Sequence, residues 1–463
     1  MAAAAKHSSG RRKLPLMRSF ARIKPISAEE KKTCVDGMTV TQRLSGWSAD
    51  KGTVTFSFDD NKKGSKKTKK DQAFSHFHYV LPPEVSQIST FEKVCSPLVM
   101  QWLNGHDIDV ICYGQTGSGK TYTQFGPPKS MKRALDALGE DGGIDTISPV
   151  GVVQKSHGLI LRTGFAALAA VDEINKRGDT SRAVLHGSMV EMSIMSDSQH
   201  ASDLLAAKKA CFVDKHHHLE GAVHLPLTDT RSLVKMAAAV ETRLTRGTKM
   251  NNSSSRSHCI TVFTLHTCDA ENGVRVSRFN FFDFMGSERF KGPNAAHGGG
   301  SARSTTAGWE GIYANYSLLY LGEAVRMATK RRRAKKGSIK RMGGKGFLNE
   351  LLSGSLVGHA VTAMITCLSG SERNGAETFL SCKYSKDMSK MQNDPQAQRR
   401  TNFDELVAEV ERDRAKSAKI AAAGVKGKYQ AKRMAEVAGY ENTLRILCKD
   451  LGRAAEAVSL PVV

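Results

Sequence analysis

The segment ICYGQTGSGKTYT, residues 111–123, constrains the fold of this chain more than any other stretch. It contains the pattern Gly-x-x-x-x-Gly-Lys-Thr, formed by Gly114, Gly119, Lys120 and Thr121. In this pattern the glycines let backbone N–H groups approach phosphate oxygens, the lysine reaches the β- and γ-phosphates, and the threonine hydroxyl can bind Mg²⁺. The apolar run 109–113 predicts the buried strand that precedes such a loop. The segment therefore predicts a nucleotide site.

Strand-like and helix-like segments alternate around this loop. Residues 279–284 form a second apolar run, and 311–327 carry Leu318, Leu319, Leu321 and Val325 at helical spacing. This alternation predicts an α/β fold, namely a P-loop NTPase with a central, mostly parallel twisted sheet flanked by helices on both faces. The segment 127–156, which contains Pro, Gly and Asp, predicts a long surface insertion.

Two polar segments follow the loop along the chain, MNNSSSRSH (250–258) and FFDFMGSER (281–289). The first places hydroxyl and imidazole side chains around Arg256, which favours a polar clamp over a core. The second ends a hydrophobic strand at Asp283, where a ligand of Mg²⁺-bound water belongs, and Gly286 follows with an N–H for a γ-phosphate. The Asp-Phe-x-Gly sequence does not indicate a protein kinase, because kinases do not use the Gly-Lys-Thr loop.

In order and wording, these segments resemble the P-loop, switch I and switch II of the kinesin motor domain family. Kinesins carry GQTGSGKT, Asn-x-x-Ser-Ser-Arg-Ser-His and Asp-Leu-Ala-Gly-Ser-Glu; the matching segments here are 114–121, 251–258 and 283–288. Three further segments are similar to the family's adenine-binding strand, the helix after switch II and the last strand–helix segment: ARIKP (21–25), NYSLLYLG (315–322) and ETFLSCKYS (377–385). The resemblance implies a motor domain at 19–391, preceded by a disordered basic arm at 1–18 and followed by a neck or helical appendage at 392–463.

The resemblance implies a site for ATP and Mg²⁺. The residues that it places around ATP are Arg22, Lys24 and Pro25 beside the adenine, Tyr122 stacked on it, Gly114, Gln115, Thr116, Gly117, Ser118, Gly119, Lys120 and Thr121 at the phosphates, and Asn251 and Ser254 in switch I. The implied Mg²⁺ ligands are Thr121 and Ser255, with Asp283 acting through water. The implied catalytic residues are Ser255, Arg256, Gly286 and Glu288. In this scheme Gly286 senses the γ-phosphate, and Arg256 pairs with Glu288 to organise the attacking water.

The net charge of +23 predicts a polyanionic partner. Basic residues concentrate in two loop-like runs, 62–70 and 330–341. The resemblance implies microtubules as the partner and a cytoplasmic, cytoskeletal location, with movement toward the plus end. The residues expected to hold tubulin's acidic tails are Lys330, Arg331, Arg332, Arg333, Lys335, Lys336, Lys340 and Arg341. No apolar run approaches the roughly 18 residues of a membrane span, and no specific nucleic-acid partner is expected.

Four departures from the family pattern bear on activity. Met285 replaces alanine in switch II, Lys24 replaces arginine in the adenine strand, and only Glu191 is kept in the strand MVEMSIMSD. The segment from Met342, MGGKGFLNELLSGSLVG, lacks most of the polar residues by which kinesins contact tubulin. Besides an ATP-dependent motor, the sequence therefore leaves open a microtubule-binding structural protein with little turnover, a microtubule-remodelling kinesin, and a P-loop ATPase acting on nucleic acid.

The segment after the motor carries amphipathic helical patterns. Phe403, Leu406, Val407 and Val410 mark one helix. A second set repeats at three- and four-residue spacing, as a heptad seam would: Val437, Tyr440, Leu444, Leu447 and Leu451. Because about two heptads are too few for a coiled coil, this pattern predicts a helical appendage that could form a weak dimer through 403–451.

Overall fold

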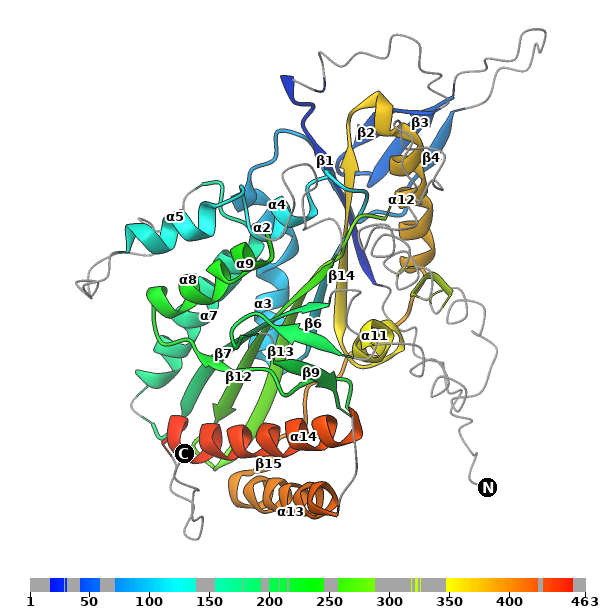
Figure 1. The fold of residues 1–463 in the computed structure, drawn as a ribbon. Helices are drawn as coiled ribbons and strands as arrows, with labels where there is room; N and C mark the ends of the chain where they lie inside the picture. Colours follow the sequence, from blue (N-terminus) through cyan, green and yellow to red (C-terminus); the bar gives the residue numbers. More distant parts are fainter. Residues whose placement is uncertain are drawn as a thin grey trace, which may run out of the picture.

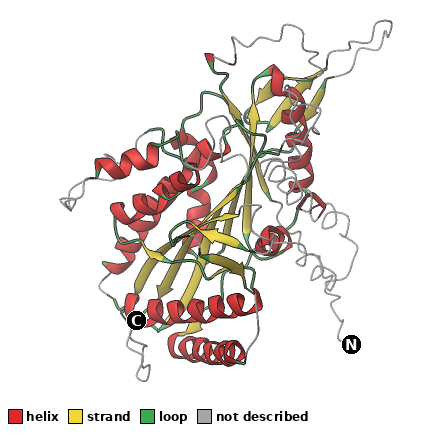
Figure 2. Cartoon of the chain, in the orientation of Figure 1, coloured by secondary structure: helices red, strands yellow, loops and turns green. Residues whose placement is uncertain are grey.

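A mixed sheet of twelve strands runs through the described part of the chain, and helices cover both of its faces (Figures 1 and 2). The structure is a computed structural model. It describes residues 17–28, 30, 42–58, 71–138, 155–177, 179–192, 200–207, 209–214, 216–244, 257–287, 318, 321–323, 325, 347–423 and 428–452.

The strands of the large sheet are ordered β10-β9-β8-β7-β12-β13-β6-β14-β1-β5, with β11 beside β7 and β15 beside β13. Their bounds are β1 (Arg18–Lys24), β5 (Tyr79–Leu81), β6 (Ile108–Tyr113), β7 (Arg182–Met192), β8 (Ala201–Asp203), β9 (Ala210–Val213), β10 (Leu219–Glu220), β11 (Leu225–Pro226), β12 (His258–Cys268), β13 (Gly273–Asp283), β14 (Val361–Ser369) and β15 (Thr401–Asn402). The predicted strands 109–113 and 279–284 correspond to β6 and to the end of β13.

The sheet divides into a parallel half and an antiparallel half. Strands β13, β6, β14, β1 and β5 pair in parallel, whereas β7 to β13 pair with one another antiparallel. The prediction of a mostly parallel sheet is therefore corrected to a mixed one. The physical reason is the tight turn between β12 and β13, where the Asp269 carboxylate accepts the N–H groups of Glu271 (3.0 Å) and Gly273 (2.8 Å). Strands joined by so short a connection can only pair antiparallel.

One face of the sheet is covered by the helices that lie between residues 87 and 244. These helices are α2 (Gln87–Val94), α3 (Ser96–Leu103), α4 (Lys120–Gln124), α5 (Ser130–Ala137), α7 (Leu159–Asn175), α8 (Thr230–Ala238) and α9 (Val240–Leu244). Their apolar residues, with Trp102 and Leu233 among them, form a core cluster with the inner side chains of β6, β12 and β13. The element α5 lies inside the predicted surface insertion 127–156. That prediction is wrong for α5, because Met131 and Ala134 lie on one helix face and are buried.

The opposite face is covered by α11 (Phe347–Val357), by the helical residues Leu318, Leu321 and Val325, and by α12 (Gly375–Met388), which a 3₁₀ turn (Glu372–Asn374) precedes. Leu318, Leu321 and Val325 are three of the four residues of the predicted helical stripe, and all are buried; the fourth, Leu319, lies outside the described residues. A small separate sheet of β2 (Arg43–Ser48), β3 (Thr53–Ser57) and β4 (Gln72–Phe74) packs on α12. Phe56 and Phe74 meet the Phe379 ring of α12 with centroids 5.3 Å away in each case.

The last described segment is a helical hairpin. It consists of α13 (Phe403–Ala422), α14 (Lys428–Arg445) and a π-helical turn, η6 (Ile446–Asp450), and it lies across one end of the sheet (Figure 1). The Asn402 side chain caps α13 by accepting the N–H of Asp404 at 2.9 Å. Leu444, Leu447 and Leu451 of the predicted seam are buried within the chain's own core, so these three side chains are not available to a second copy; the weak dimer through 403–451 stays a prediction. None of the described helices is long and apolar enough to cross a membrane.

Candidate nucleotide site

The phosphate loop joins the buried strand β6 to the short helix α4, as the motif requires. Gly114, Gly117 and Gly119 have φ angles of +151°, +76° and +99°. At Gly114 the requirement is also steric, because an added Cβ would lie 2.3 Å from the carbonyl oxygen of Cys367 in β14. The glycines therefore allow a loop that turns sharply while packing on the neighbouring strand.

Lys120 is buried at the centre of this loop. Its Nζ donates to the carbonyl oxygens of Gly114 and Gln115, each at 2.7 Å. These bonds hold the ammonium group within the loop whose N–H groups a phosphate would contact. The Ser118 hydroxyl is buried in the same loop and has no hydrogen-bond partner within the described residues.

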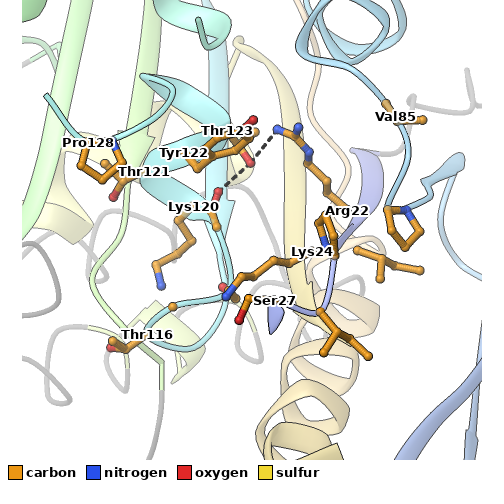
Figure 3. A pocket seen from close by; sticks show the side chains of 17 residues that line it. Arg22, Lys24, Ser27, Val85, Thr116, Lys120, Thr121, Tyr122, Thr123 and Pro128 are labelled. Atoms are coloured by element: carbon orange, nitrogen blue, oxygen red, sulfur yellow. Dashed lines mark hydrogen bonds between the residues drawn. The ribbon is translucent and has the colours of Figure 1, made fainter. Parts of the chain in front are cut away.

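A pocket of about 610 Å³ opens beside the loop (Figure 3). The residues that line it are Arg22, Ile23, Lys24, Pro25, Ile26, Ser27, Pro83, Val85, Thr116, Gly117, Ser118, Gly119, Lys120, Thr121, Tyr122, Thr123 and Pro128. The structure thus brings together the predicted adenine residues Arg22, Lys24, Pro25 and Tyr122 and the predicted phosphate residues 116–121. Gly114 and Gln115 lie in the loop behind them.

Arg22, in the pocket wall, connects β1 to α2 and α4 through hydrogen bonds. Its Nη1 donates to Gln87 Oε1 and to Thr123 Oγ1, both at 2.9 Å, and its guanidinium carbon lies 5.5 Å from the Tyr122 ring centroid. Burial lowers the pKa of Arg22, and the group is held by these neutral acceptors. Gln87 also donates to the Tyr122 carbonyl oxygen at 2.6 Å. Lys24 forms an ion pair with Glu30 at 3.0 Å.

Asp283 stands at the end of β13, next to the phosphate loop. Its Oδ2 accepts hydrogen bonds from Thr121 Oγ1 (2.7 Å) and Arg243 Nη1 (3.0 Å). Its Oδ1 is buried and has no hydrogen-bond partner within the described part of the chain. A buried carboxylate oxygen left open beside a threonine hydroxyl fits a water bound to Mg²⁺, the ligand environment that this ion prefers in nucleotide sites.

Arg243 is a site residue that the sequence motifs did not indicate. It is fully buried, and its Nε donates to Ser257 Oγ at 2.9 Å. Ser257 Oγ in turn donates to Glu191 Oε1 at 2.8 Å. Burial, the largest influence, lowers the pKa of Arg243, but Asp283, Cys259 and Glu191 together raise it above its ordinary value. One ion-pair network therefore links Asp283 to the start of β12. Glu191 lies in β7 and is the one residue of the segment MVEMSIMSD that keeps the kinesin pattern. It was the sequence feature that could have pointed to this network.

The predicted switch II segment, described here as residues 283–287, forms hydrogen bonds to both the phosphate loop and β12. Ser287 N–H donates to the Gly114 carbonyl oxygen at 3.1 Å. Met285 N–H donates to His258 Nδ1 at 3.3 Å, and the His258 ring lies edge-on to Phe284 with centroids 5.3 Å apart. Burial lowers the pKa of His258 to about 3, so the imidazole that accepts this bond is neutral near pH 7. The Met285 side chain is buried in the core cluster that includes Leu321 and Leu352 of the covering layer.

Several predicted residues lie outside the described part of the chain. They are Asn251, Ser254, Ser255, Arg256 and Glu288, together with the basic run 330–341. Gly286 is described and buried, directly after Met285.

Comparison with known proteins decides the family. The family model for the kinesin motor domain matches residues 22–391. The chain belongs to the kinesin motor domain family. Kinesin-like protein KIF27 of Homo sapiens is 28% identical over 352 residues, which are 70% of this chain and 22% of that protein. Kinesin-like protein KIN-1 of Arabidopsis thaliana is 26% identical over 337 residues, 71% of this chain and 63% of that protein. The kinesin chain thus spans less than two thirds of each of these relatives.

Solved kinesin structures show the same fold. One, described as the structure of a fast kinesin, has a TM-score of 0.61 at 22% identity and covers 84% of this chain and 94% of its own. A second, a KIF14 dimer in complex with a microtubule, has a TM-score of 0.61 at 21% identity and covers 83% of this chain and 97% of its own. The predicted family and the P-loop fold class are therefore confirmed, and the family is one of microtubule motors.

Proposed function

We propose that this kinesin-family chain is an ATP-dependent microtubule motor, which binds Mg-ATP beside the phosphate loop and couples its hydrolysis to filament binding and movement. The observation that carries the proposal is the Thr121–Asp283–Arg243–Ser257 network, because it joins the end of β13 and the start of β12 to the phosphate loop at Thr121, which lines the pocket. A chain that had lost nucleotide chemistry would have little reason to keep two buried carboxylates and a buried arginine in this arrangement.

Each part of the pocket has a proposed task in holding ATP. The loop N–H groups and Lys120 bind the phosphates, while Tyr122 stacks on the adenine beside Arg22, Lys24 and Pro25. Thr121 and Ser255 would hold Mg²⁺ directly and Asp283 through water. When bound, the ion neutralises charge on the phosphate oxygens.

Hydrolysis itself needs positioning more than covalent chemistry. We assign the γ-phosphate contact to the N–H of Gly286, whose neighbour Met285 is held by His258. Arg256 and Glu288 would close the site as an ion pair, with the Glu288 carboxylate receiving the proton of the attacking water through a second water. Asn251 and Ser254 would complete switch I around the phosphates.

A second candidate is a microtubule-binding protein with little ATP turnover, or one that remodels the filament. The specific observation behind it is the altered segment 342–358, in which Phe347, Leu348 and Leu352 are buried in the core. Side chains that are buried in the core cannot contact a filament, so this segment has fewer residues available for binding tubulin.

Measuring ATP turnover with and without microtubules separates these functions. For a motor we expect strong stimulation by microtubules, and pelleting with microtubules that is tight in a non-hydrolysable ATP analogue and weaker in ADP. Pelleting that ignores the nucleotide, without turnover, would leave the structural function. Stimulation by nucleic acid alone would reject both microtubule functions.

We further propose that Lys330, Arg331, Arg332, Arg333, Lys335, Lys336, Lys340 and Arg341 tether the motor to tubulin's acidic tails. Changing all eight to glutamine should weaken microtubule cosedimentation most at low salt, because exposed charges are screened within about 8 Å at physiological ionic strength. The control replaces the six lysines of the other basic run, 62–70, in the same way, and the losses are compared per charge removed. Equal losses in the two variants would show a general charge effect and contradict a specific tether.

A further inference from the structure

The hairpin α13–α14 covers the end of strands β7, β12 and β13 that lies farthest from the phosphate loop (Figure 1). Leu444, Leu447 and Leu451 form an apolar cluster there with Cys268 of β12 and Val274 of β13. Apolar packing of this kind holds the hairpin in place but does not by itself respond to pH, because none of its groups titrates in this range.

Three histidines lie beside this apolar cluster. They are His186 in β7, His266 in β12 and His224 just before β11. The His186 and His266 rings meet edge-on with centroids 5.4 Å apart. His186 Nε2 lies 3.0 Å from Asp450 Oδ2 in η6. The Nδ1 atoms of all three rings are buried, and within the described residues none has a hydrogen-bond partner.

The surroundings of these rings disfavour their protonated forms. Burial lowers the pKa of His224 to about 3 and also lowers the pKa values of His186 and His266. The charged groups that face the rings are Arg445 and Asp450 from the hairpin and Arg278 from β13. The two arginines disfavour a further positive charge, and Asp450 favours one on His186 alone. Arg445 moreover binds both oxygens of Asp450, at 3.0 and 2.8 Å.

A carboxyl group at the same interface, that of Glu220, has a raised pKa, whereas the pKa values of the histidines are lowered. Glu220 of β10 faces Glu436 of α14, and burial together with repulsion from Glu436 and Asp214 raises the pKa of Glu220 to about 7. Lys432 and Arg433 offset this only in part. The docked hairpin therefore favours a protonated Glu220 and three neutral histidines.

We propose that the hairpin 403–450 is a proton-controlled latch, held on the sheet near neutral pH and released as the pH falls below about 6. Once the hairpin is released, the histidines return toward an ordinary pKa near 6.5, so release takes up protons at all three rings, about one of them at His224. Glu220 holds about one more proton in the docked state than in the released state between its ordinary pKa near 4.5 and about 7. Near pH 5.5 the protons of His224 and Glu220 thus offset each other, and the uptake at His186 and His266 makes docking weaken as the pH falls.

The two titrating sets make the latch testable with variants of opposite effect. His224→Gln removes about one proton from the uptake, so the pH dependence of release should become weaker by about 10-fold per pH unit than in the unchanged chain. Glu220→Gln removes the opposing proton, so the pH dependence of release should become steeper by about 10-fold per pH unit. A purely structural role for these side chains would not move the two slopes in opposite directions. His200→Gln, outside this cluster, is the control and should behave as the unchanged chain.

The measurement is amide hydrogen exchange of the full-length chain from pH 5 to pH 8, corrected for the intrinsic pH dependence of exchange. We expect α14 to lose protection below about pH 6 while β6 in the core stays protected. A pH-independent α14, or equal slopes in the two variants, would overturn the latch, as would loss of α14 and β6 together. If His224→Gln does not fold, the steeper slope expected of Glu220→Gln decides alone. Because no nucleotide or filament is needed, the outcome is independent of the proposed function.

Discussion

Replacing Glu288 with alanine should lower kcat for ATP hydrolysis by about 10²- to 10⁴-fold and leave the Kd for ATP nearly unchanged. The change removes the proposed proton acceptor without touching the phosphate loop or the pocket wall. Turnover is measured in the presence of microtubules and the Kd with a fluorescent ATP analogue. Glu271→Ala is the matched control, because Glu271 is an exposed glutamate of the β12–β13 turn that pairs with Arg400.

The same scheme predicts how Arg256 and Glu288 combine. Arg256→Ala should reduce turnover by a similar factor, and the double variant should be little worse than either single one, since the two residues act as one unit. Turnover that survives Glu288→Ala within about 10-fold would remove Glu288 from the mechanism. Additive losses in the double variant would show that the two side chains act separately.

The parts of the site that the sequence predicted are those whose geometry is set by neighbours along the chain. The phosphate loop directly follows β6, Tyr122 lies in α4 immediately after the loop, and Asp283 ends β13, so a local pattern in the chain suffices to locate each of them. Arg243 and Gln87 were missed for a physical reason. A buried polar group must find a partner, but the partner is chosen by tertiary packing and leaves no local pattern. Arg243 meets Asp283 from 40 positions away in the chain.

Two features of the fold illustrate the same limit. Leu444, Leu447 and Leu451 would show the same three- and four-residue spacing whether they packed on a second copy of the chain or on the chain's own sheet. The spacing alone therefore could not distinguish a dimer interface from packing within the chain. The mixed sheet depends on the turn at Asp269, which a period-two strand pattern does not reveal.

Arg243→Ala should lower the free energy of unfolding by about 3–5 kcal/mol, the largest loss of stability we expect from a single change in this chain. The arginine is fully buried, and its removal takes the ion pair at 3.0 Å away from Asp283, which keeps its hydrogen bond from Thr121. Within the described residues, this buried carboxylate would then lack its counter-charge. Arg243→Lys keeps the charge but cannot reproduce the contacts to both Asp283 and Ser257, so its loss should be intermediate. Urea denaturation at pH 7 measures both.

Arg400→Ala is the control for losing an arginine as such. Arg400 binds Asp269 and Glu271 at the surface, where solvent screens the pairs, so the free energy of unfolding should hardly change. A second measurement separates positioning from stability. Because Arg243 orients the carboxylate proposed to hold Mg²⁺-bound water, Arg243→Lys should weaken binding of Mg-ATP more than binding of ATP in EDTA. Equal weakening would make Arg243 a residue of the core alone, and a loss no larger than that of Arg400→Ala would remove it from both roles.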